Sequence, residues 1–226
     1  MYKQLIFTFA IAVSMATSTF AAGVTVEVSG MTATVTGTAH DDQIIIGQPW
    51  DGSNTVWIFD VDERGYNVCG ILDLDVVLFI NVFGGDGDDY ILHDSTETFV
   101  NMFGEAGNDQ LYCGELADWF DGAEGGAGDD FLYAGHQGGS MHGNEGDDSL
   151  FGDTWVGGRT NPVTLIGGAG SDWILGSAND DLIAAGDGES DFINCGGGND
   201  FDNEFASFDA IDVVINCDGV DNPHYE

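Results

Sequence analysis

The chain has 226 residues, of which 40 are Asp or Glu and 3 are Lys or Arg, so its formal net charge at pH 7 is −37. Nucleic-acid binding needs clustered Lys and Arg to replace counterions, so this composition excludes a nucleic-acid ligand. It also argues against acidic polysaccharides and anionic lipids as ligands. Because hydrophobic residues still make up 43% of the sequence, we expect a folded protein whose excess negative charge requires a counter-ion.

The N-terminal segment has the pattern of a secretory signal. Lys3 precedes an apolar run at residues 5–13, and small residues follow up to Ala22, as in cleavable export signals. The apolar run is too short to span a bilayer, and no later segment is long enough. We expect a signal peptide at residues 1–22, bacterial-type export and a secreted protein, with the periplasm as the alternative location.

A β-rich N-terminal portion is predicted for residues 23–83. Alternation of apolar and polar residues, together with β-branched and aromatic residues, marks the strands. The first two flank Ser29-Gly30, which indicates a hairpin, and no stretch has the periodicity of a helix. Four segments are predicted as strands: 24–28, 31–35, 55–61 and 72–83.

A glycine-rich string that ends in Asp recurs through the rest of the chain. Residues 84–89 read GGDGDD and are followed by Tyr-Ile, so that a large apolar residue stands at position 8 of the repeat. Glycine allows positive φ, Asp supplies a hard oxygen ligand, and the residue at position 8 faces a core. The pattern therefore predicts both a fold and a ligand. The aspartates at position 6 are Asp42, Asp89, Asp109, Asp130, Asp148, Asp172, Asp181, Asp191 and Asp200.

The spacing of these aspartates indicates a solenoid. From Asp89 to Asp172 the intervals are 20, 21, 18 and 24 residues, and the later ones are 9, 10 and 9 residues. Two nine-residue units make one turn, so the early copies recur once per turn. We place Asp118, Asp181 and Asp200 on one edge. The aspartates of the opposite edge are Asp89, Asp109, Asp130, Asp148, Asp172 and Asp191.

These repeats resemble the RTX family, whose haemolysin-type nonapeptide is GGxGxDxUx, with U a large apolar residue. The resemblance implies an all-β fold, a right-handed parallel β-roll or β-solenoid, with calcium ions in the turns between successive rungs. Members of this family usually leave the cell by a one-step route with an uncleaved C-terminal signal, and the N-terminal signal here argues against that route. The resemblance covers residues 37–44 and 84–212. We therefore expect a signal peptide (1–22), a β-rich cap that includes the first repeat-like segment (23–83), a calcium-binding roll (84–212) and a C-terminal cap or tail (213–226).

Several Ca²⁺ ions are the expected cofactors. The carboxylates at position 6 and glycine carbonyls of the turns are the expected ligands, although Glu189, where the repeat has glycine, puts the turn of Asp191 in doubt. The alternative is a set of ordinary tight turns in an acidic solenoid. The turn carbonyls are assigned to Gly85, Gly87, Gly107, Gly126, Gly128, Gly146, Gly168 and Gly170. Acids at position 5 are expected to face solvent or make secondary contacts: Asp41, Asp88, Asp129, Asp147 and Asp180.

The four cysteines of an exported chain predict two disulfides. Three pairings are possible. Proximity favours Cys195–Cys217, which are 22 residues apart, and this would leave Cys69 with Cys113. A zinc site is the alternative, but no CxxC pair supports it.

Aromatic side chains at positions 7 and 9 of the repeats are expected to face outward, on both sides of the inward residue. So large an apolar face predicts cover by the inserts at 93–103, 134–142 and 152–166, or an aromatic platform for a glycan or protein partner. The outward aromatic residues are Tyr90, Tyr112, Phe131, Tyr133, Phe151 and Trp173.

No catalytic motif is present: the sequence lacks HExxH and GxSxG. The sequence therefore predicts a secreted, non-enzymatic calcium-binding protein with a role at a surface or in a matrix. The alternatives are a glycan-active enzyme built on a parallel β-solenoid, and an adhesion or ice-binding module. A cleft with converging acids and an arginine would favour the enzyme, and a flat ladder of identical small residues would favour the ice-binding module.

Overall fold

The computed structural model describes residues 23–48, 53–62, 65–94, 98–113, 121–135, 138–152, 161–198 and 208–217. The predicted signal peptide lies outside the described residues. Within them, every regular element is a β-strand, and no helix capable of crossing a membrane occurs.

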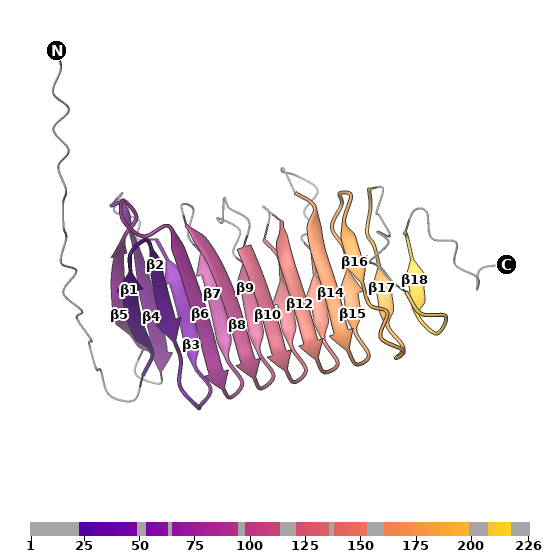
Figure 1. The fold of residues 1–226 in the computed structure, drawn as a ribbon, viewed down its shortest axis with the longest axis horizontal. Helices are drawn as coiled ribbons and strands as arrows, with labels where there is room; N and C mark the ends of the chain where they lie inside the picture. The colour runs from indigo at the N-terminus through magenta and orange to yellow at the C-terminus, as the bar shows by residue number, and fades with distance from the viewer. Residues whose placement is uncertain are drawn as a thin grey trace, which may run out of the picture.

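Two sheets run along the long axis of the molecule, and successive rungs follow the sequence from one end to the other (Figure 1). The eight-stranded sheet has the order β1 (Thr25–Ser29), β2 (Thr32–Thr36), β6 (Phe79–Asp86), β8 (Phe99–Ala106), β10 (Asp121–Ala127), β12 (Gly139–Glu145), β14 (Val163–Ala169) and β16 (Leu182–Ala184). The ten-stranded sheet has the order β18 (Val213–Ile215), β17 (Phe192–Asn194), β15 (Trp173–Leu175), β13 (Ser149–Phe151), β11 (Phe131–Tyr133), β9 (Gln110–Cys113), β7 (Tyr90–Asp94), β3 (Gln43–Gly47), β4 (Thr55–Asp62) and β5 (Gly65–Asp73).

The pairing of the strands is that of a parallel β-solenoid. Only the hairpins β1–β2, β3–β4 and β4–β5, all at the N-terminal end, pair antiparallel in the described part of the chain. From β6 onward each strand pairs in parallel with the strand one turn later, as β6 with β8 and β7 with β9. The predicted all-β roll is confirmed.

Apolar residues at equivalent positions stack along the interior. In the ten-stranded sheet Ile91, Leu111 and Leu132 are in register and fully buried, and in the eight-stranded sheet Val82 and Met102 are likewise. These side chains occupy alternate positions of their strands, which is why each strand buries one face. Each buried side chain contributes at most about 1.5–3 kcal/mol to folding, so the core stability grows with the number of rungs.

The N-terminal hairpins agree with the strands predicted from the sequence, except at one strand. The predicted hairpin is confirmed as β1 and β2, and the strand at 55–61 as β4. The single strand predicted for 72–83 is wrong: Asp73 accepts the N–H of Asp75 on Oδ1 and that of Val77 on its carbonyl, both at 2.9 Å. This local turn ends β5 and separates it from β6, and β5 itself was not predicted.

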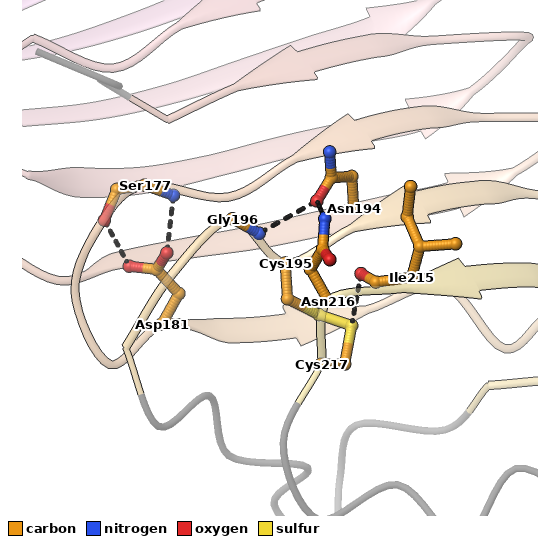
Figure 2. The surroundings of a disulfide bond; sticks show 8 residues. All are labelled: Ser177, Asp181, Asn194, Cys195, Gly196, Ile215, Asn216 and Cys217. Carbon is orange, nitrogen blue, oxygen red and sulfur yellow. Dashed lines mark hydrogen bonds between the residues drawn. A yellow bond between two sulfur atoms is a disulfide. The ribbon is translucent and has the colours of Figure 1, made fainter.

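One of the two predicted disulfides is present. Cys195 and Cys217 are bonded, with their Cα atoms 5.0 Å apart, and they tie the ends of β17 and β18 together (Figure 2). Cys69 in β5 and Cys113 in β9 are both thiols. Four strand spacings separate β5 from β9 in the sheet order, or about 19 Å at about 4.8 Å each. A disulfide spans less than about 7 Å between Cα atoms, so the second pairing is wrong.

The aromatic residues lie on the outer face of the ten-stranded sheet, as predicted. Their rings stack along the sheet, with centroids 5.3 Å apart for Tyr90–Tyr112 and 5.1 Å for Phe131–Phe151. These rings are half-buried, whereas Trp173 is 55% exposed. Cover by the inserts is wrong for the parts that form strands, because these belong to β8, β12 and β14 of the other sheet and to the end of β7 in the same sheet. The insert residues 95–97, 136–137 and 153–160 lie outside the described residues.

Candidate metal centre

The aspartates at position 6 form a continuous ladder along the edge where the eight-stranded sheet turns into the ten-stranded one. In each case a backbone N–H donates to Oδ1 of the aspartate in the next rung, at 2.7–3.1 Å. All members are buried. The ladder links Asp42, Asp89, Asp109, Asp130, Asp148, Asp172, Asp191 and Asp212. The structure thus brings together the predicted edge and adds Asp42 and Asp212 to it.

The second oxygen of most of these carboxylates has no hydrogen-bond donor. Six Oδ2 atoms are buried without a partner, those of Asp89, Asp109, Asp130, Asp148, Asp172 and Asp191. Each of the six aspartates is only 1–3% exposed. A buried polar atom without a partner costs about 1–3 kcal/mol, and more when it is charged. A row of such atoms in an otherwise regular fold indicates a bound cation.

Backbone carbonyls approach the same oxygens. A Cβ built on Gly84 would lie 2.2 Å from Oδ2 of Asp89 and 2.7 Å from the carbonyl oxygen of Gly104. Both oxygens therefore flank one point at position 1 of the turn, and a side chain there would displace them. The same convergence recurs at Gly104, Gly125 and Gly143. Such a set of carboxylate and carbonyl oxygens suits Ca²⁺, which takes six to eight oxygen ligands.

The turn conformation explains the glycines at position 4. Gly107, Gly128, Gly146 and Gly170 have φ between 130 and 142°, and a Cβ on any of them would lie 1.9–2.0 Å from a carbonyl oxygen of the preceding rung. Such backbone favours glycine. The glycines predicted to supply turn carbonyls therefore all lie in the stacked turns with positive φ: Gly85, Gly87, Gly107, Gly126, Gly128, Gly146, Gly168 and Gly170.

Burial raises the pKa of these carboxyls. Desolvation is the largest cause, and neighbouring aspartates add to it, while the N–H bond from the preceding rung opposes it. The pKa rises to about 7 for Asp89, Asp130, Asp148 and Asp191, and to about 6 for Asp109 and Asp172. Near neutral pH these buried carboxyl groups therefore tend to bind either protons or a cation.

A second, exposed ladder runs beside the first in the opposite direction. The N–H of Asp88 donates to Oδ1 of Asp41 at 3.1 Å, and Asn108 donates in turn to Asp88 at 2.9 Å. Three further bonds continue the row through Asp129, Asp147 and Ser171. The residues at position 5 thus make the predicted secondary contacts, between rungs.

Two of the predicted ligands are placed differently from the rest. Oδ2 of Asp42 accepts the N–H of Thr38 at 2.5 Å. Asp181, at the opposite edge before β16, accepts the N–H of Val163 on Oδ1 and that of Ser177 on Oδ2. Asp118 and Asp200 lie outside the described residues.

Side chains alone would not make a metal site. Among the described residues no three His, Cys, Asp or Glu side chains converge as a metal centre. An ion at this edge must take most of its oxygens from the backbone of two stacked turns.

The repeats also match a known family. The description RTX calcium-binding nonapeptide repeat fits four segments of the chain, at 81–95, 121–136, 140–154 and 164–190. These four segments are RTX calcium-binding nonapeptide repeats. The copy at 104–109 lies outside the matched segments, yet its Asp109 occupies the same ladder. No curated protein and no solved structure matches the chain.

Repeats of this family bind calcium and are typically non-catalytic. Four segments of the chain thus match calcium-binding repeats, and the parallel β-solenoid is consistent with the β-roll of such repeats. The disulfide between Cys195 and Cys217 fits an extracellular location.

Proposed function

We propose that this protein is a secreted, non-enzymatic β-roll whose folding depends on calcium and which acts by binding partners at a surface or in a matrix. The observation that carries the proposal is the row of six buried Oδ2 atoms without donors. Their negative charges would repel one another in an empty fold. Calcium binding supplies the missing partner and the neutralising charge together.

The proposed ligands are the position-6 carboxylates and carbonyl oxygens of the adjoining turns. Gly84 and Gly104 show the arrangement, since Oδ2 of Asp89 and the Gly104 carbonyl flank the same point. When bound, Ca²⁺ would supply charge neutralisation and cross-linking of successive rungs. The protein supplies stacked turns that hold both kinds of oxygen.

Calcium titration of the chelated chain tests the proposal. We expect little β-structure in residues 84–212 without calcium, and a circular-dichroism transition at about 0.1–1 mM Ca²⁺, the range of extracellular sites. Magnesium at the same concentration is the control, because its smaller octahedral shell fits these sites poorly. An unchanged spectrum and thermal midpoint in chelator would contradict the proposal.

The interaction role rests on the outer aromatic face. Half-buried rings are stacked along the ten-stranded sheet, and Trp173 among them is exposed, with its ring centroid 5.4 Å from that of Phe192 in the next rung. Exposed apolar patches of this kind mark contact sites for sugars or proteins. We expect Trp173→Ser to reduce retention on an insoluble glycan or a cell surface without changing calcium-dependent folding. Ile211→Ser is the matched control, because Ile211 is equally exposed, at 55%. Equal retention of both variants would exclude this face.

A further inference from the structure

Position 2 of the repeat adopts two backbone conformations in this chain. Along the aspartate ladder five copies have positive φ at this position, from 78 to 125°, at Gly85, Glu105, Gly126, Asn144 and Gly168. At the opposite edge Gly196 also has positive φ, at 88°. Glu105 and Asn144 are among the few residues other than glycine with positive φ in the described part of the chain. A glutamate in this region is uncommon, so the fold imposes this conformation on the turn. We call the five turns of the ladder open.

In two other copies the position-2 residue is Thr38 or Ser177, and neither has positive φ. The N–H of each donates to Oδ2 of its own position-6 aspartate, Asp42 or Asp181, at 2.5 Å. Ser177 adds a hydroxyl bond of 2.8 Å to Oδ1 of Asp181, and both donors face the carboxylate in Figure 2. We call these two turns closed.

Five of the six orphaned Oδ2 atoms belong to the open turns, and Asp42 and Asp181 are absent from that set. The sixth belongs to Asp191, whose position-2 residue, Asp187, has no positive φ and does not donate to this oxygen. Rotation of the peptide plane between positions 1 and 2 reverses the directions in which its N–H and C=O groups point. The closed form therefore turns a donor toward the carboxylate, and the open form turns the donor away.

The same rotation governs the carbonyl oxygen contributed by the next rung. A Cβ built on the position-1 glycine of an open turn would lie 2.5–2.8 Å from the position-1 carbonyl oxygen of the next rung, which comes from Gly104, Gly125, Gly143 or Gly167. The next-rung carbonyls also reach the two closed turns, where Gly84 and Cys195 approach the Cβ positions of Gly37 and Gly176 to 2.0 and 2.2 Å. At Gly167 the next turn has Asp187 at position 2, without positive φ. The three atoms nearest to a Cβ built on Gly167 all belong to Asp172, and no carbonyl oxygen of the next rung is among them.

We propose that the peptide at position 2 decides which turns of this protein bind calcium. The inference rests on the proposed function. A complete site requires an open turn followed by another open turn, which gives four intervals along this edge, from the turn at 84–89 to the turn at 167–172. Asp42 and Asp181, which the sequence pattern alone counts as ligands, use their carboxylates as internal acceptors for Thr38 and Ser177 and hold no ion.

The first test compares calcium stoichiometry, by calorimetry and equilibrium dialysis with Ca²⁺ alone, in the full chain and its Asp→Asn variants. Asp130→Asn should lose at least one ion per chain, whereas Asp42→Asn and Asp181→Asn should keep the unmodified number. Circular dichroism in excess calcium verifies that each variant folds. Loss of an ion from Asp42→Asn would overturn the inference. An unmodified chain that binds no calcium would overturn the proposed function and this inference with it.

The second test changes position 2 and leaves every carboxylate in place. Asn144→Gly should stay open, because Gly126 and Gly168 occupy the same position with positive φ. Asn144→Thr should close the turn as Thr38 does, because β-branched residues rarely adopt positive φ. We expect Asn144→Thr to lose at least one ion and Asn144→Gly to lose none. Equal stoichiometry in the two variants would overturn the role of position 2.

Discussion

At the scale of single residues, each repeat needs an aspartate and a glycine for different reasons. The aspartate uses Oδ1 for the ladder and leaves Oδ2 for a cation, as at Asp109. The glycine at position 4 permits the stacking of turns, since a Cβ on Gly107 would lie 1.9 Å from the Gly87 carbonyl oxygen. The first requirement concerns a ligand, and the second concerns the fold.

Removing Asp109 should weaken calcium binding more than removing Asp191. Asp109 lies between two open turns, whereas the turn of Asp191 has Asp187 and Glu189 at positions 2 and 4, without positive φ. Asp109→Ala also removes the acceptor for Asp89. Calorimetry of the two variants measures the difference, and an equal loss of ions would contradict it.

A methyl group at position 4 should destabilise the roll even with calcium bound. We expect Gly107→Ala to lower the free energy of unfolding by about 1–3 kcal/mol or more, because positive φ and the carbonyl contact both oppose Cβ. Gly47→Ala is the control, since a Cβ there meets nothing within 4 Å. Denaturation in saturating calcium measures both, and equal stability would contradict this account.

At the scale of elements, the inner ladder joins successive rungs through buried carboxylates, and the disulfide joins the last two strands of the ten-stranded sheet. Desolvation raises the pKa of the ladder carboxyls to about 6–7, above the value of about 3.9 in an unfolded chain. The folded state therefore binds more protons than the unfolded state between these values.

This difference predicts the pH dependence of the metal-free protein. Protonation should stabilise the fold fully below about pH 4, and this stability should be lost as pH rises through 6–7, where the folded-state carboxyls ionise. In chelator we expect the thermal midpoint to fall from pH 4 to pH 8. Calcium should reverse the trend, because protons compete with the ion. A midpoint in chelator that rises with pH would contradict the prediction.

The disulfide should stabilise the C-terminal end of the roll. It closes a loop of 22 residues, for which chain entropy gives about 3 kcal/mol. We expect the Cys195→Ser, Cys217→Ser double variant to lose up to this amount, with hydrogen exchange increased first in β17 and β18. Cys69→Ser is the control. Uniform loss of protection along the chain would contradict a local effect.

At the scale of the whole molecule, the solenoid is a series of rungs that each contact only their neighbours, so stability is a sum over rungs and interfaces. Calcium is proposed to act at the interfaces between open turns. Chelation should then raise hydrogen exchange most between residues 84 and 172, and least in the hairpins β1–β2 and β3–β4–β5, which contain no open turn among their described residues. Mass spectrometry resolves the segments, and a uniform increase would contradict this distribution.

The sequence by itself determined the repeat, the all-β roll, the edge of aspartates and the inward residues, because each rung reuses the same local rules: glycine for positive φ, Asp before the strand, and alternation within it. It also predicted the Cys195–Cys217 bond. The sequence missed the turn after Asp73, where hydrogen bonds to both the side chain and the carbonyl of Asp73 end the strand. It also missed the distance between Cys69 and Cys113, which depends on the order of strands in the sheet.

Only the tertiary structure decided which aspartates remain open to a cation. Asp42 and Asp89 have the same position in the repeat, but the Thr38 N–H occupies Oδ2 of Asp42, while Oδ2 of Asp89 has no donor. The difference depends on the orientation of a single peptide and on the carbonyl of the next rung. The aspartate at position 6 does not encode either feature, because they depend on the residue at position 2 and on how two distant turns stack.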